Sequence, residues 1–297
     1  MKTILRYSGG KSRAIKKIGH VADNFDTVIS PFIGGGSLEV HWAAQGKKVI
    51  GGDIFFALTN WWEHLLNNPE GLADEMRKIN PTSEDYNRVK EELIKWDYTQ
   101  EMLKDWKTDH YKRDGLKLDL LTAAAYYYFN HQCSYGPAYL GWASKVYLNE
   151  SKWNGMVETT KNFKLPTLEV LCREFQTMFE DHPGDFFYLD PPYYLGEDRD
   201  NKMFKGIYPM RNIPVHHDGF DHGLLSDLIR AHDARGSKFA LSYNDCSLIR
   251  ELYKGFNFEY PEWHYSMGQG EKRIGKNRIK NGSDHTKKSH EILIHNL

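Results

Sequence analysis

The stretch TVIS-PFIGGG-SLEVHWAAQ-G-KKVIGGD, from Thr27 to Asp53, decides the fold. Its first block is a short apolar run that predicts a buried strand, and its second is a glycine-rich turn. The third block has helical spacing and ends at a glycine, which is typical of a helix C-terminus. The last block predicts a second strand. A strand, a helix and a strand in this order are typical of a parallel α/β sheet.

The same alternation returns in the second half of the chain. The apolar run Phe186-Phe187-Tyr188-Leu189 predicts a fully buried strand. Around it, the pattern predicts helices at 168–179, 221–235 and 245–254, and strands at 237–243, near 256–265 and at 291–295. The two ends of the chain are therefore expected to form one sheet with helices on both faces.

The middle of the chain differs from both ends. Residues 61–130 lack strand signals and show helical spacing, with a helix start predicted at Thr82. Cys133 lies in a stretch rich in aromatic residues and glycine, 126–153, whose second half predicts a loop or hairpin. We expect a discontinuous α/β domain made of 1–60 and 163–297, with an inserted, mainly helical domain at 61–162.

Composition excludes several classes of protein. A chain of 297 residues can bury a sizeable core without disulfides or metals. The three cysteines lack metal-ligand spacing and predict free thiols, and the cluster His216, His217, Asp218 and His222 fits no common zinc spacing, so no metal is predicted. No segment approaches the about 18 apolar residues of a membrane span, and no signal peptide is recognised. We therefore expect a soluble, cytoplasmic protein without membrane contact.

Local charge is more informative than the total. The chain has 39 Lys and Arg against 40 Asp and Glu, which excludes a polycation, but a basic segment interrupted by Gly and Asn lies near the C-terminus. Its candidates for contact with a nucleic-acid backbone are Lys272, Arg273, Lys276 and Arg278. Aromatic residues set among Gly and Pro are further candidates for nucleic-acid contact, namely Tyr135, Tyr139 and Trp142.

The glycine-rich turn predicts a cofactor site. A ligand can approach a glycine backbone closely at a helix N-terminus, and Asp53, at the end of the next strand, can accept hydrogen bonds from ribose hydroxyls. The pattern thus indicates a cofactor that contains adenosine. The glycine spacing does not fit G-x-G-x-x-G, so a dinucleotide is less favoured than a cofactor without a pyrophosphate.

The second motif is Asp190-Pro191-Pro192-Tyr193, directly after the strand 186–189. Two successive prolines end the strand and offer carbonyl groups without N–H donors. Ligands bind at the carboxyl ends of strands in open α/β sheets. Asp190 and the Pro191 carbonyl are therefore expected to accept hydrogen bonds from an exocyclic amino group, and Tyr193 is expected to supply a stacking face.

The ordered motifs resemble those of Dam-like, alpha-type DNA adenine-N6 methyltransferases. The resemblance rests on Tyr7-Ser8-Gly9-Gly10-Lys11, 30–37, Asp53, Asp190 to Tyr193 and Glu291-Ile292-Leu293-Ile294. It implies a Rossmann-like methyltransferase sheet, an inserted helical DNA-recognition domain and S-adenosylmethionine as the cofactor. The implied cofactor-binding residues are Tyr7, Gly10, Lys11, Phe32, Ile33, Gly34, Gly35, Gly36, Ser37, Asp53, Ile54 and Asp190, and the implied catalytic residues are Asp190, Pro191, Pro192 and Tyr193.

The implied reaction is methyl transfer to adenine N6 in a short sequence of double-stranded DNA, after the base is flipped out. Methylation of cytosine N4 remains an alternative, because both acceptors are exocyclic amines, and so does a catalytically idle DNA-binding subunit. A nicotinamide-dependent enzyme is disfavoured by the glycine spacing. The middle of the chain departs from the family pattern, so the target sequence stays open, as do a cognate restriction endonuclease and the oligomeric state.

Overall fold

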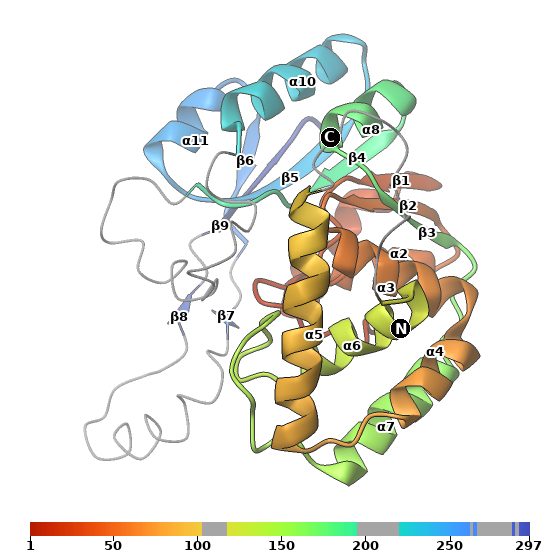
Figure 1. The fold of residues 1–297 in the computed structure, drawn as a ribbon. Coiled ribbons are helices and arrows are strands. Elements are labelled where there is room, and N and C mark those ends of the chain that lie inside the picture. Colours follow the sequence, from red (N-terminus) through yellow and green to blue (C-terminus); the bar gives the residue numbers. More distant parts are fainter. Residues whose placement is uncertain (103–117, 195–219, 262–263, 266–286, 289–290) are drawn as a thin grey trace, which may run out of the picture. The chain divides into compact units, whose positions relative to one another are not determined.

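A computed structural model describes residues 1–102, 118–194, 220–261, 264–265, 287–288 and 291–297. It divides into two compact units (Figure 1). The sheet unit contains Met1–Thr3, Tyr7–Ile54 and Leu165–Leu297, and the helical unit contains Ile4–Arg6 and Phe55–Lys164. The unit boundaries therefore lie after residues 54 and 164, whereas the sequence placed the domain boundaries after 60 and 162.

The sheet unit is built on seven strands in the order β3-β2-β1-β4-β5-β9-β6. Their bounds are β1 Thr27–Ser30, β2 Lys48–Asp53, β3 Leu168–Cys172, β4 Phe186–Leu189, β5 Phe239–Asn244, β6 Asn257–Glu259 and β9 Glu291–His295. All neighbours are parallel except β9, which runs antiparallel between β5 and β6. A separate two-stranded sheet pairs β7 His264–Tyr265 with β8 Lys287–Lys288. The predicted α/β, Rossmann-like class is confirmed.

Helices cover both faces of the large sheet. They are α1 Ile15–Ile18, α2 Ser37–Ala43, α8 Phe175–Asp181, α10 His222–Ala234 and α11 Ser247–Leu252, with short 3-10 turns η1 Lys11–Arg13 and η2 Gly19–Ala22. Because side chains alternate along a strand, β4 contacts helices on both sides. Leu189 packs in a core cluster with Leu225 of α10, while Tyr188 meets Trp42 of α2 with ring centroids 5.1 Å apart.

The single helix predicted at 168–179 is wrong. Its first part is β3, which pairs in parallel with β2 over five residues, and only its second part is helical, as α8. As an edge strand β3 is only partly buried, and its apolar Leu168 and Leu171 have a spacing of three that resembles one face of a helix. The long-range pairing with β2 selects the strand.

The helical unit consists of five helices within the described residues. They are α3 Phe56–Asn67, α4 Pro69–Arg77, α5 Ser83–Met102, α6 Leu120–Gln132 and α7 Glu150–Lys161. Their core is aromatic: the ring of Trp61 stacks on Tyr128 with centroids 5.3 Å apart, and Trp153 packs edge-on against Phe129 at 4.9 Å. The sequence did not predict α7. Within the described ranges, no helix combines the length and apolar character needed to cross a membrane.

Candidate active site

The reversal of strand order beside β1 forms the candidate site. The chain continues from β1 to β2 and β3 on one side, while β4 and β5 lie on the other. The register Ile29↔Phe187 brings the carboxyl ends of β1 and β4 together, so the loops that follow them diverge from neighbouring points. Asp190 comes directly after Leu189, the last residue of β4, and therefore lies at this reversal.

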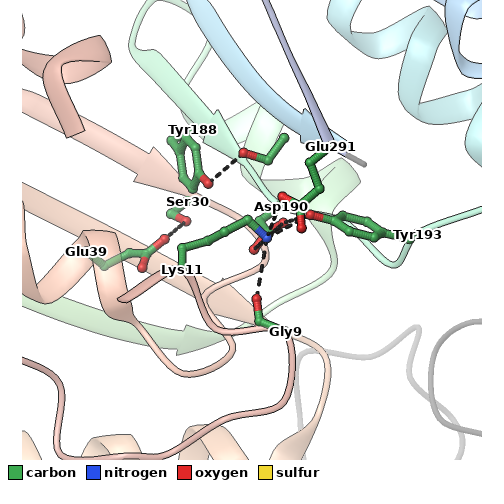
Figure 2. Close-up of polar contacts among 9 residues, drawn as sticks. Gly9, Lys11, Ser30, Glu39, Tyr188, Asp190, Tyr193 and Glu291 are labelled. Atoms are coloured by element: carbon green, nitrogen blue, oxygen red, sulfur yellow. Dashed lines mark hydrogen bonds and ion pairs between the residues drawn. The ribbon is translucent and has the colours of Figure 1, made fainter. Parts of the chain in front are cut away.

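Lys11 and Asp190 form the centre of this site (Figure 2). The Nζ atom of Lys11 donates to Asp190 Oδ1 at 2.7 Å and Oδ2 at 2.9 Å, and to the Tyr193 hydroxyl at 2.7 Å. Lys11 is only 5% exposed. Because an ammonium group is seldom buried without partners, these hydrogen bonds are what its burial requires. Glu291 at the start of β9 contributes a further carboxylate, with Oε2 3.5 Å from Lys11 Nζ.

A tight turn brings Lys11 to the end of the sheet. The Gly10 N–H donates to the Tyr7 carbonyl at 3.1 Å, and Gly9 has φ +77, in the left-handed region that favours glycine. A Cβ atom on Gly10 would lie only 3.1 Å from the Tyr7 carbonyl oxygen. The two glycines therefore serve the turn that positions Lys11, and no ligand is needed to explain them.

The charge state of Asp190 depends on two opposing effects. Burial raises the pKa of Asp190 above its ordinary value, and the neighbouring Lys11 ammonium lowers that pKa through its charge and its hydrogen bonds. Asp190 thus combines a partly desolvated carboxyl group with a cation that favours its ionised form. As a carboxylate it can accept hydrogen bonds from an amino group.

A second buried carboxyl group lies on the α2 face of the sheet. Glu39 of α2 is 3% exposed and accepts a hydrogen bond of 2.7 Å from the Ser30 hydroxyl at the end of β1. Burial raises the pKa of Glu39 to about 7 from 4.5. Glu39 therefore keeps its proton in the folded chain up to about neutral pH.

Glu39→Gln should make stability less dependent on pH. In the parent, the pKa of Glu39 is higher in the folded state than in the unfolded state. The resulting contribution of Glu39 to folding stability is fully present below pH 4.5 and is lost as the pH rises through 7. Glutamine keeps a polar partner for Ser30 and cannot ionise. The variant's stability relative to the parent should therefore rise by about 2 kcal/mol between pH 5 and pH 8. Urea unfolding of both proteins across this range measures it, and a pH-independent difference would refute it.

The loop after β1 contacts Asp53 at the end of β2. The Gly34 N–H donates to Asp53 Oδ2 at 3.2 Å, and Gly34 and Gly36 have φ values of +46 and +63, which favour glycine. A Cβ atom on Gly35 would lie 2.4 Å from Tyr7 Cβ. The sequence predicted that the glycines let a ligand approach the backbone closely. At Gly35 it is the Tyr7 side chain that makes this close approach.

The other predicted cofactor residues differ in exposure. Ile33 and Ser37 are buried, at 3% and 6%, and the Ile33 side chain packs over Gly51, while their contact with the cofactor stays a prediction. Phe32 is half-buried and lies against Phe175 and Phe220. Ile54 is 38% exposed although it is apolar.

The residues after β4 are less accessible than expected. Pro191 is buried and Pro192 is half-buried. Tyr193 is 5% exposed, its ring stacks on Tyr243 with centroids 5.9 Å apart, and its hydroxyl donates to Asp190 at 3.3 Å. The ring of Tyr193 is thus largely covered in this structure, where its hydroxyl contacts Lys11 and Asp190, and its stacking on an extruded base stays a prediction.

The predicted DNA-contacting aromatics separate into exposed and buried residues. Tyr135 and Trp142 are 50% and 85% exposed on a short hairpin closed by the bridge Ser134↔Ala143. Tyr139 is 6% exposed and packs on Phe55, with ring centroids 5.2 Å apart, and its DNA contact stays a prediction. Lys272, Arg273, Lys276 and Arg278 lie outside the described residues, as do His216, His217 and Asp218.

Sequence reasoning did not name Glu39 and quoted Glu291 only within the closing motif, so neither was predicted as a neighbour of the site. Glu39 interrupts the apolar pattern of the helix SLEVHWA, and Glu291 begins the buried strand EILIH. Acidic residues are seldom fully buried unless they are paired. An acid at a predicted core position is thus the signal that could have found both.

Comparisons with known proteins identify relatives of this chain. The chain is 23% identical over 273 residues to a DNA N-6-adenine-methyltransferase of Escherichia phage P1, covering 87% of this chain but 32% of the phage protein. It is also 23% identical over 285 residues to the retron Ec67 DNA adenine methylase of Escherichia coli, covering 90% of this chain and 86% of that relative. The family model of the D12 class N6 adenine-specific DNA methyltransferases matches residues 7–267, and the chain therefore belongs to this family.

Proposed function

We propose that this chain transfers a methyl group from S-adenosylmethionine to N6 of adenine in a short sequence of double-stranded DNA. The observation that supports this proposal most directly is the position of the Asp190 carboxylate. Lys11 binds both of its oxygens at the point where the strand order reverses. Family membership supports a methyl donor and a DNA substrate. The cofactor's identity and flipping of the target base are further parts of the proposal.

The residues around the sheet edge fit S-adenosylmethionine. Asp53 presents a half-buried carboxylate at the end of β2, suited to accept hydrogen bonds from a ribose diol. The exposed apolar side chain of Ile54 is suited to cover an adenine ring. When bound, the cofactor supplies a methyl group on a positively charged sulfur.

The chain's own residues orient the acceptor. An exocyclic amine conjugated to its ring is a poor nucleophile, because its lone pair is delocalised. Hydrogen bonds from the amino group to Asp190 and to the Pro191 carbonyl would direct that lone pair toward the methyl group. The amino group of a paired base is inside the duplex, so the base must first be extruded, at a cost of a few kcal/mol.

The helical unit is proposed to recognise the target sequence. Its hairpin carries the exposed Trp142 and is held from within the unit, because Asn130 Oδ1 accepts from the Leu140 N–H at 2.6 Å and Lys90 Nζ donates to the Gly141 carbonyl at 3.0 Å. Leu140 has φ +53, which is uncommon for a residue with a side chain. A rigid support for an exposed aromatic residue favours a binding role.

Trp142→Ala should weaken DNA binding by about tenfold or more, because stacking of one base on an aromatic ring is worth about 1 to 3 kcal/mol. The salt dependence should stay unchanged, since tryptophan carries no charge. Ile94→Ala, at another exposed apolar residue of this unit, is the matched control. Fluorescence anisotropy with a labelled duplex across a salt series measures both, and equal affinities of the two variants would remove Trp142 from the interface.

The proposed reaction is tested by chemical identification of the product. Duplex DNA is incubated with the protein and methyl-labelled S-adenosylmethionine, and the DNA is then digested to nucleosides for chromatography. Label in N6-methyl-2′-deoxyadenosine is the expected result. Label in N4-methyl-2′-deoxycytidine would favour the alternative acceptor, and DNA binding without any label would favour an idle subunit.

A further inference from the structure

Glu291 joins the candidate site from a strand that runs in the opposite direction to its neighbour. It is the first residue of β9 and pairs with Asn244, the last residue of β5. An antiparallel strand begins where its parallel neighbours end, so the head of β9 lies at the carboxyl edge of the sheet. The Glu291 side chain is 0% exposed, and its Oε2 atom is 3.5 Å from Lys11 Nζ.

Lys11 is therefore shared between two carboxyl groups. Asp190 accepts from the ammonium at 2.7 Å, the Glu291 carboxyl lies 3.5 Å from it, and the Tyr193 hydroxyl and the Gly9 carbonyl are also within hydrogen-bond distance. Lys11 and Asp190 alone would form a neutral pair. With Glu291 ionised, the three groups carry one net negative charge.

We propose that Glu291 is a positioning residue that acts through Lys11 and keeps the site negative where the acceptor amine becomes positive. This inference rests on the proposed methyl transfer. In that step the nitrogen lone pair forms the new N–C bond, the electrons of the broken C–S bond remain on sulfur, and the nitrogen then loses one proton to water. Positive charge moves from sulfur to nitrogen, toward Asp190, and negative charge there favours the transition state.

Other titratable groups surround this trio. Glu39 of α2 interacts electrostatically with both Lys11 and Asp190, and Tyr188 of β4 interacts with the same two residues. Tyr193 contacts Lys11 and Asp190 directly. None of them is changed by a substitution at Glu291. Removing the negative charge of Glu291 removes one of the two carboxylates that contact Lys11, which should lower the pKa of Asp190.

The first test is the pH dependence of kcat for Glu291→Gln, which keeps the size of the side chain and removes its charge. We expect kcat on the plateau to fall about tenfold, with unchanged KM values for cofactor and DNA. The acidic limb of the profile should move to lower pH, following Asp190. A merely structural role would lower kcat or stability without moving that limb in this direction.

Two further variants make the kinetic result interpretable. Glu291→Asp retains the charge and should leave the acidic limb in place, with kcat between those of the parent and Glu291→Gln. His295→Gln changes a buried polar residue on the same face of β9 that contacts Glu259. It should match the parent in kcat and in pH profile, and it controls for disturbance of the strand.

A second readout does not depend on activity. The carboxyl carbons of aspartate are labelled with 13C, the Asp190 signal is assigned by its absence in Asp190→Asn, and its pKa is measured by NMR in the protein without cofactor. The pKa should be lower in Glu291→Gln than in the parent and unchanged in His295→Gln. An unchanged pKa of Asp190, or a plateau kcat within twofold of the parent, would overturn the inference. An inactive parent with a shifted pKa would instead refute the proposed function alone.

Discussion

Replacing Asp190 by alanine is expected to slow methyl transfer by about 10²-fold or more, the usual cost of removing one acceptor or donor aimed at a developing charge. Asp190 lies after the end of β4, outside the strand, so the sheet should persist. Glu291 still contacts Lys11 in the variant and limits the cost of leaving that ammonium buried. Single-turnover transfer of labelled methyl groups to duplex DNA gives the rate.

The matched control for this variant is Asp185→Ala, at the opposite end of the same strand. Asp185 precedes β4 and contacts His182 at 3.3 Å, far in sequence from Lys11. The control should transfer methyl groups at the parent rate. If Asp190→Ala retained a rate within tenfold of the parent, with the same affinities for cofactor and DNA, the assignment of Asp190 would be wrong.

The second large effect is expected for Asp53→Ala, which should weaken S-adenosylmethionine binding by about 2 to 4 kcal/mol. Charge-assisted hydrogen bonds are worth about 1.5 to 3 kcal/mol each, and two hydroxyl groups of a ribose lose their acceptor together. DNA binding without cofactor should change little. Isothermal titration calorimetry measures the cofactor affinity directly.

Two variants separate ribose binding from loop support, because Asp53 also accepts from the Gly34 N–H. Asp53→Asn keeps an oxygen for Gly34 and loses the charge, so it should bind the cofactor more tightly than Asp53→Ala but less tightly than the parent. Asp26→Ala, at an exposed carboxylate before β1, should match the parent. Unchanged affinity in Asp53→Ala would move the ribose site elsewhere, and binding of a nicotinamide dinucleotide would favour a different class of enzyme.

Local signals predicted the elements that organise the sheet. The structure confirms strands at 27–30, 48–53, 186–189 and 291–295 with the predicted bounds. Each is a short apolar run next to a glycine, proline or charged residue, so its ends are marked in the sequence. The edge strand β3 was missed because its identity depends on pairing with β2, more than 100 residues away.

The contacts of the site were harder to predict than its members. The motifs supplied Lys11, Asp53 and Asp190, but Lys11 and Asp190 are 179 residues apart, and only the folded sheet joins them. Tyr139 and Tyr193 show the same limit. Their sequence neighbours predicted exposed aromatic side chains. In the structure, Tyr139 packs against Phe55 and Tyr193 packs against Tyr243, and both are buried. Glycine and proline neighbours do not determine which side chains reach the surface.

The most direct test of the central claim is a map of modified bases in living cells. Plasmid DNA is isolated from a host that lacks DNA methyltransferases and expresses either the parent protein or Asp190→Ala, and methylated bases are located by sequencing. The account predicts N6-methyladenine at one short sequence with the parent and none with the variant. N4-methylcytosine with the parent, or N6-methyladenine at the same sites with Asp190→Ala, would contradict it.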